Sequence, residues 1–238
     1  MIYGDKDQVY VGPSAEIHPL VCLDTREGPV FIDEGAEVQA FTRIEGPCYV
    51  GKNSLILGPK IREGCSIGPT CKVGGEVEES IIHGYSNKYH DGFLGHSYIG
   101  EWVNLGAQTT NSDLKNDYGS ITVFLNGKPT DTGSTKVGCF VGDHTKTGIN
   151  TAMNTGTYIG ALCIIVAGGG VLPKYLPTGT WYLNNMITKG FGFKKLLGTA
   201  EMVMGRRKVE FGEEDADLLK AVYELQKPIR NGLIKKQR

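Results

Sequence analysis

Aliphatic residues recur every six positions along most of the chain. The period is kept in several series, which are Val11, Ile17 and Leu23; Ile32, Val38, Ile44, Val50 and Ile56; Ile61, Ile67 and Val73; Ile99 and Leu105; and Val141, Met153, Ile159 and Ile165, with Thr147 in phase. Because six is even, a strand with this repeat always turns the same side chains inward, whereas a helix would spread them around its surface. The pattern predicts short strands wound into a prism, in which each coil buries its core against the next coil.

Glycine follows the inward residue at many of these positions, as in Val50-Gly51, Ile67-Gly68 and Ile159-Gly160. Glycine accounts for 34 of the 238 residues, roughly twice its usual share. We interpret these glycines as corners of the prism, where the backbone turns sharply or takes a positive φ angle.

The six-residue period divides the chain into three expected parts. Residues 1–8 are polar and form a lead-in, and residues 9–172 form the coils. The coils are interrupted by a loop at about residues 110–136, in which Asn126-Gly127 separates two strand-like runs, and this pair is a strong hairpin signal. Residues 173–238 form a connector and a helical extension.

Two helices are expected in this extension. Apolar residues recur at helical spacing from Phe193 to Met204 and again from Leu218 to Tyr223. Acidic residues near Glu213 favour the start of the second helix, and Pro228 is expected to end it. We expect both helices to cover the open end of the prism or to pack on a neighbouring subunit.

Charge and cysteine content narrow the class of protein. The formal net charge is -1, so bulk electrostatics do not favour binding to nucleic acid or to an anionic membrane. The six cysteines contain no CxxC pair, the first residues do not read as a secretory signal, and no apolar run is long enough to span a membrane. These features predict a cytoplasmic protein with reduced thiols.

The period breaks at residues 84–93, just before His96, and the break contains His90. From this point the segment HDGFLGHSYIGEWVNLGAQTT (90–110), with NDYG (116–119), resembles the acetyltransferase domain of bifunctional glucosamine-1-phosphate N-acetyltransferase/N-acetylglucosamine-1-phosphate uridylyltransferases. GEVEESIIHGYSNK and GDHTKTGINT resemble two-domain sugar-1-phosphate nucleotidylyltransferases, of which this chain would be the C-terminal half. The resemblance implies a left-handed parallel β-helix of hexapeptide repeats. It also implies a homotrimer with sites between subunits.

The same resemblance implies roles for individual residues. His90 matches the general base, a role that suits imidazole because it titrates near neutral pH. Ala107 and Ala167 match small residues along the acetyl-CoA groove, and no metal is expected for the transfer. The acceptor side of the site is assigned to Asn104, Asn116, Phe93 and Lys115, with Lys128 as an alternative to Lys115.

Two departures leave the acceptor sugar open. The family has lysine, which meets the sugar phosphate, where this chain has Glu78 or Glu79, and a carboxylate there repels phosphate unless another cation intervenes. Phe93 stands where the family has tyrosine, so one hydroxyl is lost. Glu78, Glu79, Asp113 and Asp117 are expected to be solvated.

Two main functions are compatible with these features. The first is an acetyl-CoA-dependent N-acetyltransferase that acts on an amino-sugar 1-phosphate in nucleotide-sugar biosynthesis. The alternative is a non-catalytic trimerisation or ligand-binding domain of a sugar-1-phosphate nucleotidylyltransferase, whose catalytic half lies on another subunit or on a missing N-terminal domain. A zinc site of the γ-class carbonic anhydrase type, formed from His83, His90, His96 and His144, fits less well because the spacing and flanking residues do not match.

Overall fold

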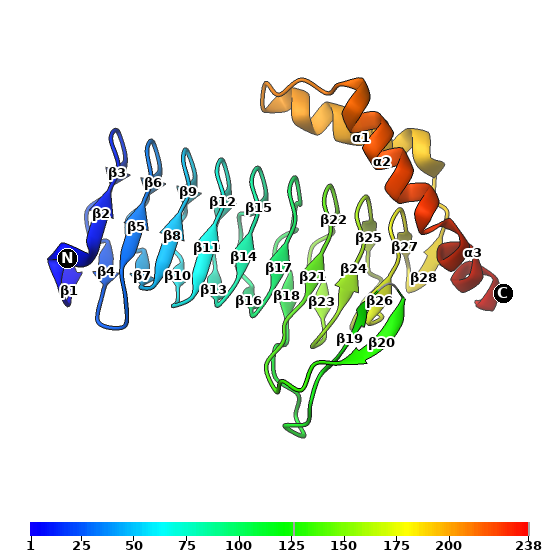
Figure 1. The fold of residues 1–238 in the computed structure, drawn as a ribbon, viewed down its shortest axis with the longest axis horizontal. Helices are drawn as coiled ribbons and strands as arrows, with labels where there is room; N and C mark the ends of the chain where they lie inside the picture. Colours follow the sequence, from blue (N-terminus) through cyan, green and yellow to red (C-terminus); the bar gives the residue numbers. More distant parts are fainter. Residues whose placement is uncertain (126, 238) are drawn as a thin grey trace.

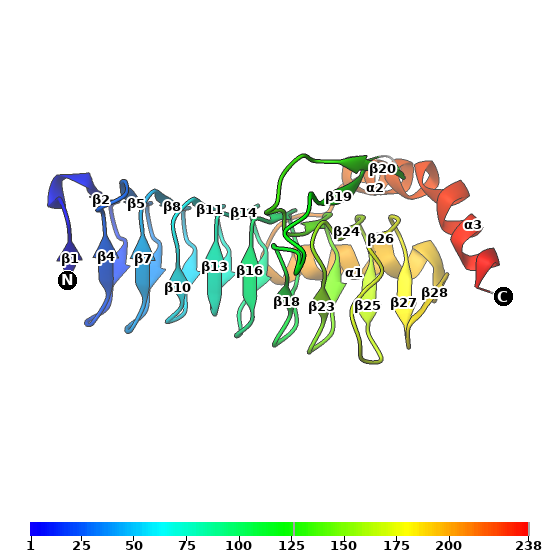
Figure 2. The same ribbon diagram turned by 90° about the horizontal axis from the view of Figure 1, so that it is seen from below.

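The computed structural model describes residues 1–125 and 127–237, and its coils form a left-handed parallel β-helix with three faces (Figures 1 and 2). The first face, seen in Figure 2, contains β1 (Ile2–Tyr3), β4 (Cys22–Asp24), β7 (Arg43–Glu45), β10 (Lys60–Ile61), β13 (Glu76–Glu78) and β16 (Phe93–Gly95), then β18 (Thr110–Asn111) and β23 (Ala152–Met153). The second contains β2 (Val9–Val11), β5 (Val30–Ile32), β8 (Cys48–Val50), β11 (Cys65–Ile67), β14 (Ile81–Ile82), β17 (Tyr98–Ile99), β21 (Phe140–Val141), β24 (Tyr158–Ile159) and β26 (Tyr175–Leu176).

The third face carries the candidate site. It contains β3 (Glu16–Ile17), β6 (Glu37–Val38), β9 (Leu55–Ile56), β12 (Lys72–Val73), β15 (Asn87–Lys88), β22 (Lys146–Thr147), β25 (Ile164–Val166), β27 (Trp181–Leu183) and β28 (Met186–Thr188). Asn104 bridges β15 to β22 through isolated parallel pairings. The last strand, β28, runs antiparallel to β27. The predicted fold class is therefore confirmed.

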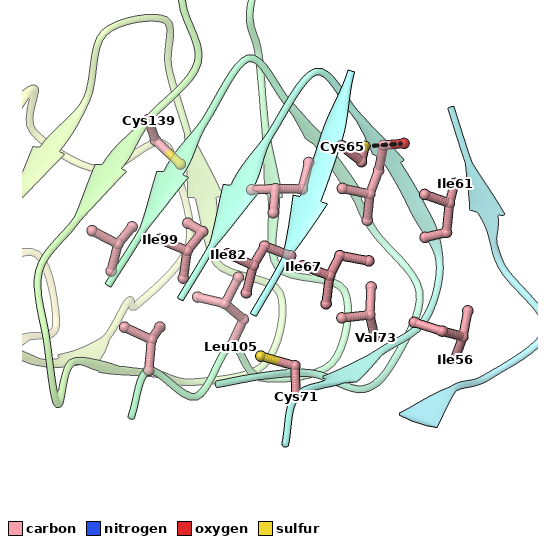
Figure 3. Close-up of a cluster of buried hydrophobic side chains, with 14 of the residues drawn as sticks. Ile56, Ile61, Cys65, Ile67, Cys71, Val73, Ile82, Ile99, Leu105 and Cys139 are labelled. Atoms are coloured by element: carbon pink, nitrogen blue, oxygen red, sulfur yellow. Dashed lines mark hydrogen bonds between the residues drawn. The ribbon is translucent and has the colours of Figure 1, made fainter. Parts of the chain in front are cut away.

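The predicted inward stripe is the core of the prism. Ile56, Ile67 and Val73 are fully buried, and equivalent residues of successive coils lie directly above one another (Figure 3). The expectation is wrong for Val11 and Ile17, which are 43% and 37% exposed. These two residues lie in the first coil, which has no earlier coil to cover it.

The corner glycines have a different physical cause from the predicted one. Gly51 and Gly142 are not in the left-handed region; instead, an added Cβ would lie 2.6 Å from the carbonyl carbon of Gly68 or 2.5 Å from the amide nitrogen of Ala161. The next coil therefore leaves no room for a side chain. The positive φ angle falls two residues later, on Asn53 and His144.

Both ends of the β-helix extend further than the six-residue period indicates. Ile2–Tyr3 pairs with β4, so the expected lead-in belongs to the first face. At the other end, β26 pairs with β24 and β27 pairs with β25, beyond the predicted limit at residue 172. Backbone pairing continues there because it does not require the aliphatic period to be kept.

The loop and the helices leave the prism on opposite edges (Figure 1). Antiparallel β19 (Thr122–Leu125) and β20 (Lys128–Asp131) confirm the predicted hairpin, although Asn126 of the expected turn lies outside the described residues. The helices are α1 (Gly192–Arg206), α2 (Glu213–Leu225) and α3 (Lys227–Lys236). Two helices were expected; Pro228 instead lies in the first turn of a third, where its missing N–H costs no hydrogen bond.

The helices pack on the last coils of their own chain. Leu196 and Ala200 of α1 form a second hydrophobic cluster with Leu162, Trp181 and Leu219. The buried guanidinium of Arg230 in α3 donates a hydrogen bond to the carbonyl oxygen of Thr178 at 2.6 Å. Within residues 1–125 and 127–237, no helix combines the length and the apolar character that crossing a bilayer requires.

The alternation of inward and outward side chains makes a prediction for β9. Ile56 is fully buried, whereas the adjacent Leu55 is partly exposed on the outer face. We expect Ile56→Ala to lower the free energy of unfolding by about 2–5 kcal/mol, because it leaves a cavity in the coil interior. The matched control, Leu55→Ala, should cost clearly less in the same denaturant titration. Equal losses in the two variants would contradict the assigned inward direction.

Candidate functional site

A cleft of about 790 Å³ lies between the third face of the prism and the C-terminal end of α1. Its floor is a column of outward side chains that pair in register across four coils, which are Lys72, Asn87, Asn104 and Lys146. Each of these residues directly precedes an inward residue of its coil. The regular winding therefore places four polar groups in one line without any further sequence signal.

His90 opens onto this cleft from the corner that follows β15. Its side chain is exposed, and its ring lies edge-on to Tyr89 with 5.0 Å between the ring centroids. Asn104 and Ala107 line the same cleft. Three of the residues predicted from the sequence are thus brought together within one chain.

Four cationic side chains line the cleft, and among its described lining residues there is no aspartate or glutamate. They are Lys72 and Lys146 from the coils and Arg206 and Arg207 from the end of α1. Arg207 donates a hydrogen bond to Oδ1 of Asn87 at 2.9 Å, which ties the helix to the floor. The cleft is therefore suited to an anionic ligand.

Lys146 is held firmly at the floor. Its Nζ donates hydrogen bonds to the carbonyl oxygens of Trp102 at 2.7 Å and His144 at 2.9 Å. Burial lowers the pKa of Lys146 to about 8. The predicted site did not include Lys72 and Lys146, although their place before an inward residue can be read from the sequence. It also did not include Arg206 and Arg207, whose position depends on the docking of α1.

A stack of rings borders the cleft. Tyr85 and Trp102 lie parallel with centroids 4.1 Å apart, and His144 continues the stack at 6.1 Å from Trp102. All three residues have positive φ angles and follow one another along one corner of the prism. Burial, assisted by the charge of Lys146, lowers the pKa of His144 to about 4.

The other predicted site residues lie outside the cleft of a single chain. Phe93 begins β16 and covers Gly95, and Ala167 packs against the core after β25. Lys115 and the exposed Asn116 belong to the loop, where Nζ of Lys115 lies 3.2 Å from a carboxylate oxygen of Asp117. Their assignment to substrate or cofactor stays a prediction.

The acidic residues are less solvated than expected. Glu78 is only 6% exposed, and its carboxylate lies 2.6 Å from Arg62 and 3.5 Å from Lys136. His96 lies between two carboxylates, with Nε2 3.0 Å from Glu79 and Nδ1 2.8 Å from Asp113. The expectation of solvation is wrong for Glu78 because the preceding coil and the loop supply cations to it.

The histidines considered for a zinc site have separate surroundings. His83 packs on Tyr98, with 4.8 Å between the ring centroids, and His144 belongs to the ring stack beside Trp102. Among residues 1–125 and 127–237, no group of three or more histidine, cysteine, aspartate or glutamate side chains is placed to hold a metal ion. The six cysteines are unpaired, and five of them are buried.

The fold and cleft define a hexapeptide-repeat β-helix with a groove lined by cations, and comparison with known proteins narrows this description. No family model matches the chain. It is 40% identical over 156 residues to the bifunctional sugar-1-phosphate nucleotidylyltransferase/acetyltransferase of Sulfurisphaera tokodaii, a match that covers 61% of this chain and 37% of that protein. It is 30% identical over 187 residues to the bifunctional protein GlmU of Heliobacterium modesticaldum, covering 71% and 36%.

These relatives confirm the resemblance that the sequence motifs indicated. The chain spans little more than a third of the length of either relative. Among solved structures, the UDP-N-acetylglucosamine acyltransferase of Francisella novicida aligns over 92% of this chain and 78% of its own, with 14% identity and a TM-score of 0.41.

Burial of His144 predicts a pH dependence of stability. Its pKa is about 4 in the folded protein and about 6.5 when unfolded. Between these values the unfolded chain binds more protons, so stability falls as pH falls from about 6.5 to about 4, by on the order of 2 kcal/mol. In thermal unfolding from pH 7 to pH 4, His144→Phe should show a shallower decline than the wild type. A wild-type slope in His144→Phe would contradict the prediction.

Proposed function

We propose that this protein transfers an acetyl group from acetyl-CoA to the amine of an amino-sugar phosphate, with His90 as the general base. The observation that carries the proposal is the opening of His90 onto a cationic cleft, together with Asn104 and Ala107. The acetyltransferase named in the Sulfurisphaera tokodaii relative supports the reaction class.

The proposed chemistry uses few groups. The imidazole of His90 removes a proton from the neutral sugar amine as the nitrogen attacks the thioester carbonyl, and the C–N bond forms as the C–S bond breaks. The departing thiolate of CoA then takes up a proton from the imidazolium. Transfer is direct, since the cysteines are buried except for the partly exposed Cys22, which lies coils away from the cleft. Asn104 lies on the cleft floor, where its amide can orient the acceptor.

The cations of the cleft can replace the phosphate-binding lysine that the family has at the position of Glu78 or Glu79. Glu78 is already paired with Arg62 and Lys136, so it does not present an uncompensated negative charge. In our proposal Lys72, Arg206 and Arg207 contact the phosphate of the acceptor or of CoA instead. Guanidinium groups suit this role because they bind phosphate oxygens in a bidentate manner.

A second subunit belongs to the same proposal. An outward column on the second face includes Tyr10, Phe31, Tyr49, Ile81 and Tyr98, each between 36% and 46% exposed. Long exposed apolar stripes of this kind indicate protein contacts. This exposed column supports the expected homotrimer, in which we propose that Phe93, Lys115 and Asn116 of one copy approach the cleft of another.

The role of His90 is tested by acetyl transfer to glucosamine-1-phosphate and galactosamine-1-phosphate. Loss of the general base in His90→Gln should lower kcat by about 10²- to 10⁴-fold, with little change in the melting temperature because the side chain is exposed. The control His18→Gln removes a distant imidazole and should keep wild-type rates.

Two results would contradict this assignment. Equal rates in wild type and His90→Gln would remove His90 from the mechanism. A wild type that is inactive, and whose melting temperature does not rise with millimolar acetyl-CoA, would instead favour a non-catalytic trimerisation or ligand-binding domain.

The phosphate contact is tested at the end of α1. Arg206 is exposed and lines the cleft, so Arg206→Gln should raise KM for the phosphorylated acceptor roughly fivefold, as expected for one solvent-exposed ionic contact. The matched control Lys195→Gln removes an exposed cation from the same helix outside the cleft and should leave KM unchanged. A similar rise of KM in both variants would point to bulk charge rather than to a phosphate contact.

A further inference from the structure

The interior column of the third face contains a lysine. Val38, Ile56 and Val73 pair in register along this column, and the next coil places Lys88 directly over Val73. Lys88 is 3% exposed. An ammonium group therefore occupies a position that the preceding coils give to an aliphatic side chain.

The surroundings of Lys88 satisfy its charge only in part. Its Nζ donates hydrogen bonds to the carbonyl oxygens of Gly74 and His90, both at 2.9 Å. No carboxylate among the described residues lies within ion-pair distance of it. Burial lowers its pKa to about 8, although the negative charge of Asp91 acts in the opposite direction. Because burying an ammonium costs free energy that two neutral acceptors do not fully offset, an apolar residue here should make the fold more stable.

The two carbonyl acceptors of Lys88 belong to the corners of two successive coils. Gly74 belongs to the corner of the preceding coil, and His90 belongs to the corner at which the six-residue period is broken. Gly92 closes that corner with a φ angle of 126°. The ammonium of Lys88 therefore links the carbonyl group of His90 to that of Gly74 in the preceding coil, and this link is lost when the charge is removed.

We infer that Lys88 is a positioning residue for His90, an interior lysine retained at a cost in stability because it fixes the backbone that carries the imidazole at the mouth of the cleft. It acts through His90 and does not contact substrate. The activity part of this inference rests on the proposed function, whereas its structural part does not.

Lys88→Met tests the inference because methionine keeps the length of the side chain and removes its charge. We expect the melting temperature to rise by several degrees. We also expect kcat to fall about 10- to 100-fold, since a small displacement of a catalytic group costs this much, while KM for acetyl-CoA changes less than about twofold. The control Val73→Met, one coil earlier in the same column, should keep wild-type kcat.

Amide hydrogen exchange provides a readout that needs no activity. The amides of Gln108 and Glu76 donate to the carbonyl oxygens of Asp91 and Gly92 in the His90 corner. In Lys88→Met these two amides should exchange faster although the protein as a whole melts at a higher temperature. If the wild type is inactive in acetyl transfer but the two amides still exchange faster in Lys88→Met, the proposed activity is refuted and the positioning role of Lys88 is kept.

If Lys88 only stabilised the fold, its replacement by methionine would lower the melting temperature instead of raising it. A lower melting temperature in Lys88→Met, or unchanged exchange at Gln108 and Glu76, would overturn the inference. Unchanged kcat in an active enzyme would overturn it as well.

Discussion

Parallel stacking of coils in a fixed register is the constraint on which the rest of this structure depends. Each inward residue must lie over the inward residue of the coil below, as Ile67 lies over Val50. The outward residue beside it is then aligned just as strictly. The polar column that ends at Lys146 and forms the floor of the cleft is therefore a direct product of core packing, and a one-residue slip in any coil would break both at once.

The interior becomes more polar where the cleft lies outside it. Thr147 takes an inward position that the neighbouring coils fill with aliphatic residues, and its hydroxyl lies 2.8 Å from that of Thr109. Asn111 is 4% exposed and exchanges two hydrogen bonds of 3.0 Å with the backbone of Gly95. Together with Lys88, these groups replace uniform apolar packing by directed bonds, which fix the orientation of the corners around His90 more narrowly than dispersion contacts would.

The sequence predicted the prism, its inward residues from Leu23 onward, the hairpin and the position of His90 because all of these follow from local period and motif. It failed where neighbours distant in the chain decide the outcome. Arg206 lies at the cleft only because α1 docks on the last coils, and Lys136 reaches Glu78 only because the loop folds back. The third helix was missed because a proline is compatible with both the end and the start of a helix.

The coils at the N-terminal end of the prism, from β2 to β9, lie outside the cleft. The coils from β2 to β9 contribute no residue to the groove, and each touches only the coils directly above and below it. A complete turn could therefore be inserted or deleted there without altering the arrangement around His90. Each inserted or deleted turn would change the distance from the first coil to the groove by one strand spacing of about 4.8 Å. The number of turns in these coils therefore sets how far the N-terminal end of the prism lies from the groove.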